Sequence, residues 1–272
     1  MTGKKVSRRV INVILFIFSL VWIFPIVFTI VNTFKSKQEY NLGNFWDVPA
    51  GNELGANFTY IQENANILTG VGNSFLYAIC GACFSVLIAL FAAYAITHLE
   101  IKHRMFWFMF IYCGTIFPFQ IYLIPVFKGY SELGLYNTRL GMIFFYTAIC
   151  IPFCMFVLRN FFRGISKEIL ESAKIDGASD FQILWKILVP MATAPISVVF
   201  LSQFTWCWND LMFGLTFTKS DSIRTVMSAV SLMGTVHTPA LLLACVIASV
   251  PTILLFFFMQ KNFETSFVYQ SK

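Results

Sequence analysis

The sequence gathers its most distinctive polar chemistry in one internal stretch, KEILESAKIDGASDFQILWKILVP, which runs from Lys167 to Pro190. Ser166 can cap a helix that begins at Lys167, and Gly177 can end it, because glycine most readily adopts the left-handed conformation that follows a helix. The tetrapeptide SDFQ (179–182) matches a capping box, so a second helix is expected directly after the turn. The stretch therefore predicts a helix-turn-helix over about 166–188.

Apolar residues inside this charged stretch favour binding to another protein. Ile169, Leu170 and Ile175 interrupt the acids and lysines, and Ala173 with Gly177 four residues later offers a surface of small residues. That combination suits insertion into the cleft of a partner. A solvated charged loop without a partner is the alternative interpretation.

A second polar cluster, WCWND, lies at the end of an apolar run, at residues 206–210. The rings of Trp206 and Trp208 could stack on the ring of a small polar solute, and Asn209 and Asp210 could hydrogen-bond its polar groups. We interpret these four residues as a candidate translocation pathway. Tryptophan also anchors helices at the membrane interface, which is the alternative interpretation.

The spacing of the cysteines, histidines and other reactive residues does not match a metal site or a catalytic site. Cys80 and Cys83 form a single C-x-x-C pair without the second pair or nearby histidine of a zinc site. His98 and His103 are five residues apart, which turns them to different faces of a helix. The sequence contains no G-x-x-x-x-G-K-[ST] phosphate loop and no convergent Ser/His/Asp or paired-carboxylate arrangement. We therefore expect no catalytic, cofactor-binding or metal-binding residues, and we expect that the chain is not an enzyme.

The elements that must position both clusters are membrane helices. Of the 272 residues, 58% are hydrophobic and 12% are charged, and the mean hydropathy of +0.73 is far above that of a soluble domain. Six apolar runs approach the roughly 20 residues that cross the hydrocarbon core of a bilayer. They cover about 10–34, 73–97, 105–127, 140–160, 188–212 and 240–260. We predict an all-α, polytopic membrane protein with six transmembrane helices in a single domain over residues 1–272.

Small residues and prolines add detail to these runs. Gly81, Ser85, Ala89 and Ala93 recur every four residues, which predicts a stripe where another helix packs closely. Pro118 and the prolines of the other runs can break helix hydrogen bonds and open backbone that lines a cavity.

Basic residues indicate the orientation, because cytoplasmic loops carry the excess of Lys and Arg. If the N-terminus is inside, most of the 19 Lys and Arg residues fall on the cytoplasmic side, including those of the predicted helix-turn-helix. We therefore place both termini and the 166–188 segment in the cytoplasm.

No Asp, Glu, Lys, Arg or His lies near the middle of any predicted span. Transport driven by a proton or ion gradient usually needs such a residue deep in the membrane. If the protein does energised work, we expect the energy to come from a partner. A channel or facilitator for a small polar solute, which would need no ATPase, and a membrane scaffold without transport are the alternatives.

The stretch ESAKIDGAS, with a proline thirteen residues after its glycine, closely resembles the EAA motif of the inner-membrane permeases of binding-protein-dependent ABC importers. The residues at its E-A-A and D-G-A positions are Glu171, Ser172, Ala173, Asp176, Gly177 and Ala178. In that family the motif forms a coupling helix that docks in a groove on the ATPase subunit. The resemblance implies the same role for these six residues, with Ser172 as a small-for-small replacement of alanine.

The resemblance also implies partners and an activity. The implied partners are a second, different permease subunit, two ATPase subunits and an extracytoplasmic solute-binding protein. ATP and Mg would be bound by the ATPase subunits, with no cofactor in this chain. The implied activity is ATP-driven import by alternating access across the bacterial cytoplasmic membrane.

Other stretches resemble the carbohydrate-uptake branch of this family, and specifically the smaller six-span permease of maltose transport. These stretches are VNTFKSKQEY, NSFLYA, AAYAITHLE, FPFQIYLIPVF, WNDLMFG and QKNF. Asp176-Gly177-Ala178 also differs from the Leu-Gly-Ala that is typical of polyamine and iron permeases. The resemblance therefore implies that the solute is a sugar or oligosaccharide.

Overall fold

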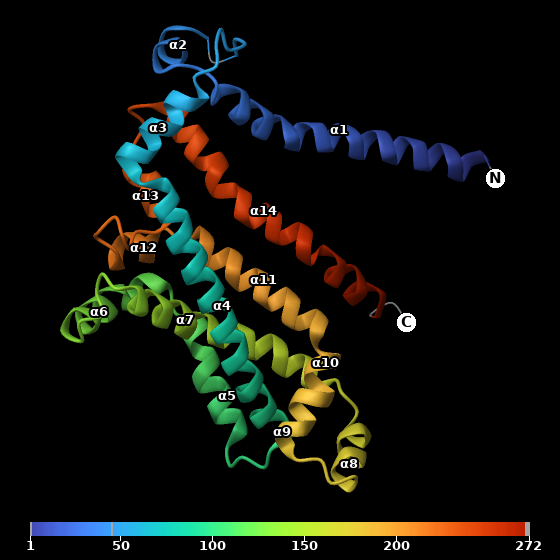
Figure 1. Ribbon diagram of the computed structural model, residues 1–272. Coiled ribbons are helices and arrows are strands. Elements are labelled where there is room, and N and C mark those ends of the chain that lie inside the picture. The colour runs from blue at the N-terminus through green and yellow to red at the C-terminus, as the bar shows by residue number, and fades with distance from the viewer. Residues whose placement is uncertain (1, 45, 270–272) are drawn as a thin grey trace. The chain divides into compact units, whose positions relative to one another are not determined.

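The computed structural model describes residues 2–44 and 46–269, and all regular structure in this part of the chain is helical (Figure 1). The predicted all-α class is confirmed. The chain divides into two compact units. One comprises the residues up to 68 together with 229–250, and the other comprises 69–228 together with the residues from 251 onward.

The first unit contains the N-terminal helices. Its elements are α1 (Thr2–Asn32), α2 (Lys37–Leu42), α3 (Leu54–Ala65) and parts of α13 (Val226–Leu232) and α14 (Thr238–Tyr269). The side chain of Asn57 donates from Nδ2 to the backbone oxygens of Thr33, at 2.8 Å, and Lys35, at 3.0 Å. These bonds satisfy carbonyl groups just beyond the end of α1 and fix the chain between α1 and α3.

The second unit contains both candidate clusters. Its elements include α4 (Ile67–His98), α5 (Arg104–Tyr112), the short 3₁₀ turn η1 (Cys113–Thr115), α6 (Phe119–Glu132), α7 (Arg139–Arg163), α8 (Lys167–Ile175), α9 (Asp180–Ile183), the π-helical turn η2 (Leu184–Leu188), α10 (Val189–Met191), α11 (Thr193–Asn209) and α12 (Met212–Phe217).

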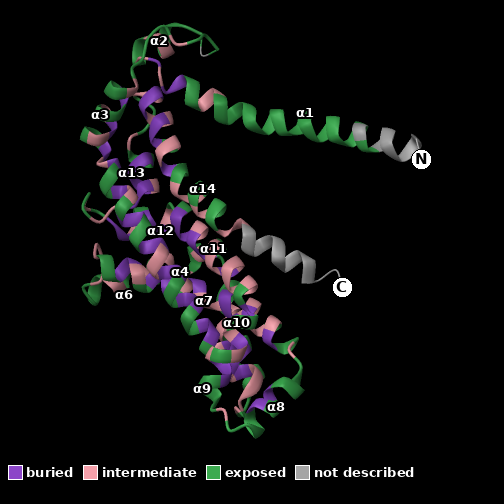
Figure 2. Cartoon of the chain, turned by 45° about the vertical axis from the view of Figure 1, so that its right-hand side comes forward, coloured by how far each residue is buried: buried purple, intermediate pink, exposed green. Residues whose placement is uncertain are grey.

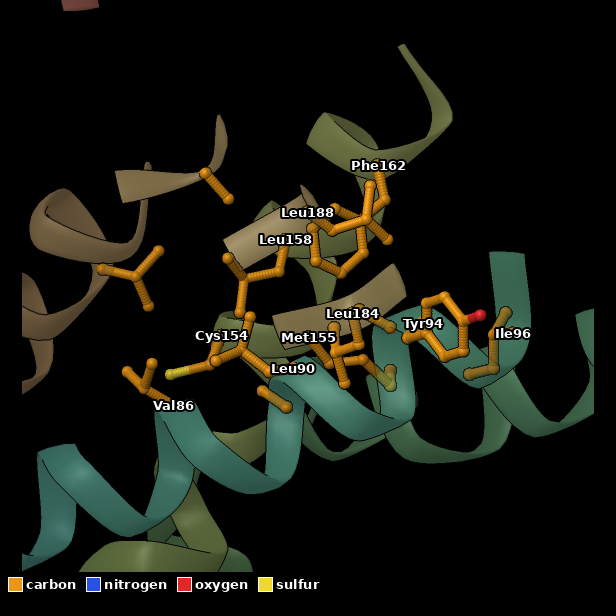
Figure 3. Packing of buried hydrophobic residues seen from close by; sticks show 14 of the residues in the cluster. Val86, Leu90, Tyr94, Ile96, Cys154, Met155, Leu158, Phe162, Leu184 and Leu188 are labelled. Atoms are coloured by element: carbon orange, nitrogen blue, oxygen red, sulfur yellow. The ribbon is translucent and has the colours of Figure 1, made fainter. Parts of the chain in front are cut away.

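A hydrophobic cluster joins α4, α7 and the segment that follows α8. Figure 3 shows Leu90 of α4, Leu158 of α7 and Leu188 of η2 in this cluster, where all three are almost fully buried. Full burial of a leucine contributes roughly 1.5–3 kcal/mol relative to an exposed one. The cluster therefore holds the helix-turn-helix against two membrane helices of its own chain.

The predicted stripe of small residues is confirmed on α4. Gly81 and Ser85 are buried, and Ala89 and Ala93 are fully buried. A β-carbon at Gly81 would lie 2.9 Å from Cβ of Tyr146 on α7, closer than side-chain atoms pack. The stripe therefore allows α4 and α7 to approach closely at this point.

Several helices are long and apolar enough to cross a membrane, so the prediction of a polytopic chain is confirmed. Among the described residues they are Val10–Asn32, Ile67–His98, Arg139–Arg163 and Thr238–Gln260. Helix α1 is exposed along most of its described apolar side chains (Figure 2). Two pairs of bent helices would add two further spans if each pair crosses the membrane once. A total of six spans therefore remains a prediction.

The bent pairs coincide with the predicted spans at 105–127 and 188–212. Arg104–Thr115 and Phe119–Glu132 meet at 94°, and Asp180–Met191 and Thr193–Asn209 meet at 79°. Pro118 lies at the first break and disfavours helical backbone in the residue before it. At the second break, Pro195 has no amide hydrogen to donate to the carbonyl of Met191. The sequence predicts one span in each place, with prolines that can break its helix hydrogen bonds, and both observed breaks lie beside prolines.

Candidate functional site

The helix-turn-helix begins as the sequence predicts. Helix α8 starts after Ser166, whose Oγ accepts a hydrogen bond from the backbone nitrogen of Glu168 at 3.3 Å. Glu168 lies in the first turn and Lys174 in the last, so both charges complement the helix dipole. The predicted cap is confirmed.

Gly177 ends α8 with a φ of +83°, which confirms the predicted left-handed conformation. The backbone nitrogen of Ala178 donates to the oxygen of Ala173, and that of Gly177 donates to the oxygen of Lys174, both at 3.0 Å. This pair of bonds is a Schellman motif, which satisfies carbonyls that the helix end would leave unpaired. No atom lies within 4 Å of where a Gly177 β-carbon would stand, so the glycine is needed for conformation and not for space.

The second helix starts immediately with the predicted capping box. The backbone nitrogen of Gln182 donates to Ser179 Oγ at 3.3 Å, and the backbone nitrogen of Ser179 donates to Gln182 Oε1 at 2.8 Å. Helix α9 then passes into the π-helical turn η2 before α10. The π turn was not predicted, because no residue type marks one in a sequence.

The two sides of α8 have different environments. Leu170 and Ala173 are 7% and 8% exposed and belong to the buried cluster. Glu171 and Ser172 are exposed, and Ile175 is 86% exposed. Asp176 and Gly177 are exposed as well, and Ala178 is half-buried. Ala173 was expected on a docking surface, but it packs against its own chain because it shares the inward face with Leu170.

A bond from α4 holds the turn between the two helices. The Tyr94 hydroxyl donates to Oδ1 of Asp180 at 2.8 Å, and Nζ of Lys174 lies 3.6 Å from the same oxygen. Tyr94 is 5% exposed, whereas half of the Asp180 side chain is exposed. Tyr94 is not identifiable from the local sequence, because its partner Asp180 lies 86 residues away in the chain.

The second cluster lies beside a cavity of about 590 Å³ in the second unit. The cavity is lined by Phe119, Gln120, Ser202, Thr205, Trp206, Asn209, Asp210, Leu211, Met212 and Phe213. The structure thus brings three of the four predicted pathway residues together at one cavity. Trp208 is not among them, because it is 1% exposed and stacks on Phe204 with ring centroids 5.9 Å apart.

The Asp210 carboxylate is engaged by its own chain. Its Oδ2 accepts hydrogen bonds from the Tyr146 hydroxyl at 2.9 Å and from the backbone nitrogen of Gly214 at 3.0 Å. Its Oδ1 accepts from the backbone nitrogen of Phe213 at 3.4 Å. Asp210 therefore fixes the first turn of α12 to α7, a role that the local sequence does not indicate.

A family model described as "Binding-protein-dependent transport system inner membrane component" matches residues 85–269. A putative ABC transporter permease protein of Caldicellulosiruptor sp. is 31% identical over 215 residues, which is 78% of each chain. The diacetylchitobiose uptake system permease protein of Streptomyces coelicolor is 26% identical over 94% of this chain and 85% of its own length. The sequence similarity extends over both candidate clusters.

The fold is similar to that of a solved permease chain. A chain of a bacterial ABC transporter that imports the acidic polysaccharide alginate matches with a TM-score of 0.77 and 23% identity, over 97% of this chain and 98% of that one. At this identity the likeness concerns the fold alone. Several apolar helices long enough to cross a membrane accompany the family match. The chain thus belongs to the family of inner-membrane components of binding-protein-dependent transport systems, as a multi-pass protein of the cytoplasmic membrane.

Proposed function

We propose that this chain is a permease subunit of an ATP-driven importer and that the segment 166–188 couples it to an ATPase. The observation that carries the proposal is the outward side of this segment. It presents Ile175 at 86%, Phe181 at 64% and Ile169 at 41% exposure, beside Glu171 and Ser172. The inward side packs in the chain's own hydrophobic core through Leu170 and Ala173, so the segment can bind a partner without detaching from its own chain.

The chemistry of the outward side defines the partner surface. Moving a large apolar side chain from water into a protein interface is favourable by roughly 1.5–3 kcal/mol when burial is complete. Carboxylates at Glu168 and Glu171 favour basic groups at the rim of such an interface. An apolar cleft with a basic rim on an ATPase subunit would complement this side of α8. Asp176, Gly177 and Ala178 would shape the turn, and Ala173 would act by positioning the helix.

We infer the remaining components of the importer from two observations. The chain belongs to this transport family, and its sequence contains no phosphate loop that could bind ATP. We infer two ATPase subunits that bind ATP and Mg, a second permease subunit and an extracytoplasmic solute-binding protein. We further infer six spans in a single transmembrane domain over residues 1–272, with both termini and 166–188 in the cytoplasm. The solute would cross by alternating access, past Trp206 and Asn209.

A sugar or oligosaccharide is the solute class that we propose. The printed name of one relative refers to diacetylchitobiose, and a chain of similar fold belongs to an alginate importer. The Asp176-Gly177-Ala178 sequence and the stacking chemistry of Trp206 agree with this class.

A charge placed on the outward side tests the coupling role. The full complex would be purified with Ile175→Glu in this chain. Ile101→Glu, in the loop between α4 and α5 that the proposed orientation also places in the cytoplasm, is the control. We expect Ile175→Glu to lower the amount of ATPase subunit that co-purifies with the permease at least tenfold, while the permease still inserts into the membrane. The Ile101→Glu variant should co-purify with the normal amount of ATPase. Equal retention in the two variants would argue against docking through α8, and a chain that moves solute with no ATPase bound would support a facilitator.

A further inference from the structure

The start of α6, the C-terminal half of α11 and the residues that follow α11 line the cavity beside Trp206. The break at Pro118 places Phe119 and Gln120 at the start of α6, and the last two turns of α11 contribute Ser202 to Asn209. Of the two helix breaks, the one at Pro118 adjoins the cavity. A broken helix in a membrane protein is tolerated where it is buried in protein or lines a water-filled space. The position of the cavity is therefore suited to a solute and not to lipid.

Apart from Asp210, the polar residues that line the cavity are neutral, and three of them lie in a row on α11. Ser202, Thr205 and Asn209 are spaced three and four residues apart on α11, which puts them on one helix face. Gln120 joins them from α6. Hydroxyl and carboxamide groups both donate and accept hydrogen bonds, as the hydroxyl groups of a sugar do. Lipid tails could satisfy none of these groups.

Trp206 is held as a fixed aromatic wall. Its ring centroid lies 5.7 Å from that of Phe119, 6.2 Å from that of Tyr146 and 6.4 Å from that of Phe213. The side chain remains partly exposed where it lines the cavity. An indole that is already immobilised loses little conformational entropy when a ring stacks on it.

The charged groups of the cavity favour neutral sugars over acidic ones. Among the described residues that line it there is no Lys or Arg, and its ionisable side chain, Asp210, is hydrogen-bonded to Tyr146, Phe213 and Gly214. A uronate carboxylate placed here would meet the Asp210 carboxylate without a neutralising cation. A neutral sugar ring carries no charge that the Asp210 carboxylate would repel, and it would meet neutral hydrogen-bonding groups and an aromatic face.

We propose that this cavity is a binding subsite for one ring of a neutral sugar, in which Trp206 stacks on the ring and Gln120, Ser202, Thr205 and Asn209 bind its hydroxyl groups. The inference rests on the proposed importer function and deepens it, because it assigns direct solute contact to this subunit. A volume of about 590 Å³ is within the usual range of roughly 300–1,000 Å³ for small-molecule sites.

Protection of introduced cysteines from a thiol reagent tests the subsite. The assembled complex in nanodiscs would carry Ser202→Cys or Asn209→Cys, with Lys219→Cys as an exposed control outside the cavity. The less buried native cysteines would first be replaced by serine: Cys80, Cys83, Cys113 and Cys245. The probes are the neutral sugars chitobiose, cellobiose and maltotriose and the acidic sugar dimannuronate, each at millimolar concentration.

We expect at least one neutral sugar to slow labelling of Ser202→Cys and Asn209→Cys about tenfold, with dimannuronate inactive and Lys219→Cys unaffected. The subsite proposal would be overturned if dimannuronate slowed labelling of these cysteines. It would also be overturned if none of the neutral sugars slowed it. Stimulation of ATP hydrolysis by the solute-binding protein, measured on the same samples, reports on the importer function separately. Loss of protection with intact stimulation would refute the subsite alone, and absent stimulation would refute the importer proposal.

Discussion

The hydroxyl of Tyr94 donates a 2.8 Å hydrogen bond to Oδ1 of Asp180, and this bond joins a membrane helix to the turn between α8 and α9. Lys174 lies 3.6 Å from the same oxygen, so both helices of the turn are connected to α4 through one carboxylate. A force on the outward side of α8 can therefore reach a membrane helix through a short, defined path.

Tyr94→Phe should impair coupling more than folding. The ring stays packed in the core, and the lost hydrogen bond is worth roughly 0.5–1.5 kcal/mol. In the reconstituted complex we expect ATP hydrolysis to continue while the amount of solute moved per ATP falls severalfold. Tyr136→Phe serves as the control. An unchanged ratio of transport to hydrolysis in Tyr94→Phe would show that the bond carries no coupling.

Gly177→Val should disturb the turn through its backbone. A β-branched residue at a φ of +83° is strained by more than the ~1 kcal/mol typical of a simpler residue. We expect the variant to insert normally but to retain less ATPase. Gly177→Asn should recover most of the retention, because asparagine tolerates this conformation. Gly72→Val is the control, since a β-carbon at Gly72 also meets no atom within 4 Å. Equal effects of Gly177→Val and Gly72→Val would contradict the argument.

Tryptophan on the two sides of α8 should have two different effects. Ala173→Trp overpacks the buried cluster, which typically costs about 1–3 kcal/mol, so α8 should detach and become sensitive to protease in the isolated chain. Ser172→Trp should leave the isolated chain as protease-resistant as the wild type but lower ATPase retention. The measurement is limited proteolysis alongside co-purification. Protease resistance in Ala173→Trp would place that residue outside the core.

Asn209→Ala and Asp210→Ala should differ in stability. Asn209 is exposed at the cavity, so its loss should lower transport with an unchanged melting temperature. Asp210→Ala leaves the fully buried Tyr146 hydroxyl without its acceptor, at a cost of roughly 1–3 kcal/mol, and should lower the melting temperature as well. Thermal unfolding of the purified complex decides the matter. Equal melting temperatures for the two variants would mean that the Tyr146 bond does not stabilise the fold.

The local features of the coupling segment were predictable from the sequence. Caps at Ser166 and Ser179 and the turn at Gly177 depend on residues within five positions of each other, so their signals are contained in a short stretch. The apolar runs and the small-residue stripe were predictable for the same reason, since each follows one helix.

Features that depend on distant partners were not predictable. The side on which Ala173 lies is set by a core built from α4 and α7, and Tyr94 meets Asp180 across 86 residues. Trp206 and Trp208 are two residues apart, and the sequence alone gives them the same predicted role. The packing around α11 buries Trp208 and leaves Trp206 at the cavity. The bends near Pro118 and Pro195 depend on whether neighbouring helices accept a break, which proline alone does not decide.

Solute accumulation in proteoliposomes tests the central claim most directly. The chain would be reconstituted with its second permease, its ATPases and its solute-binding protein, using the sugar that this protein binds most tightly in a panel. The account predicts accumulation against a gradient only when the set is complete and ATP is hydrolysed, and none with Ile175→Glu. Accumulation without the ATPases, or solute flux through this chain alone, would contradict it.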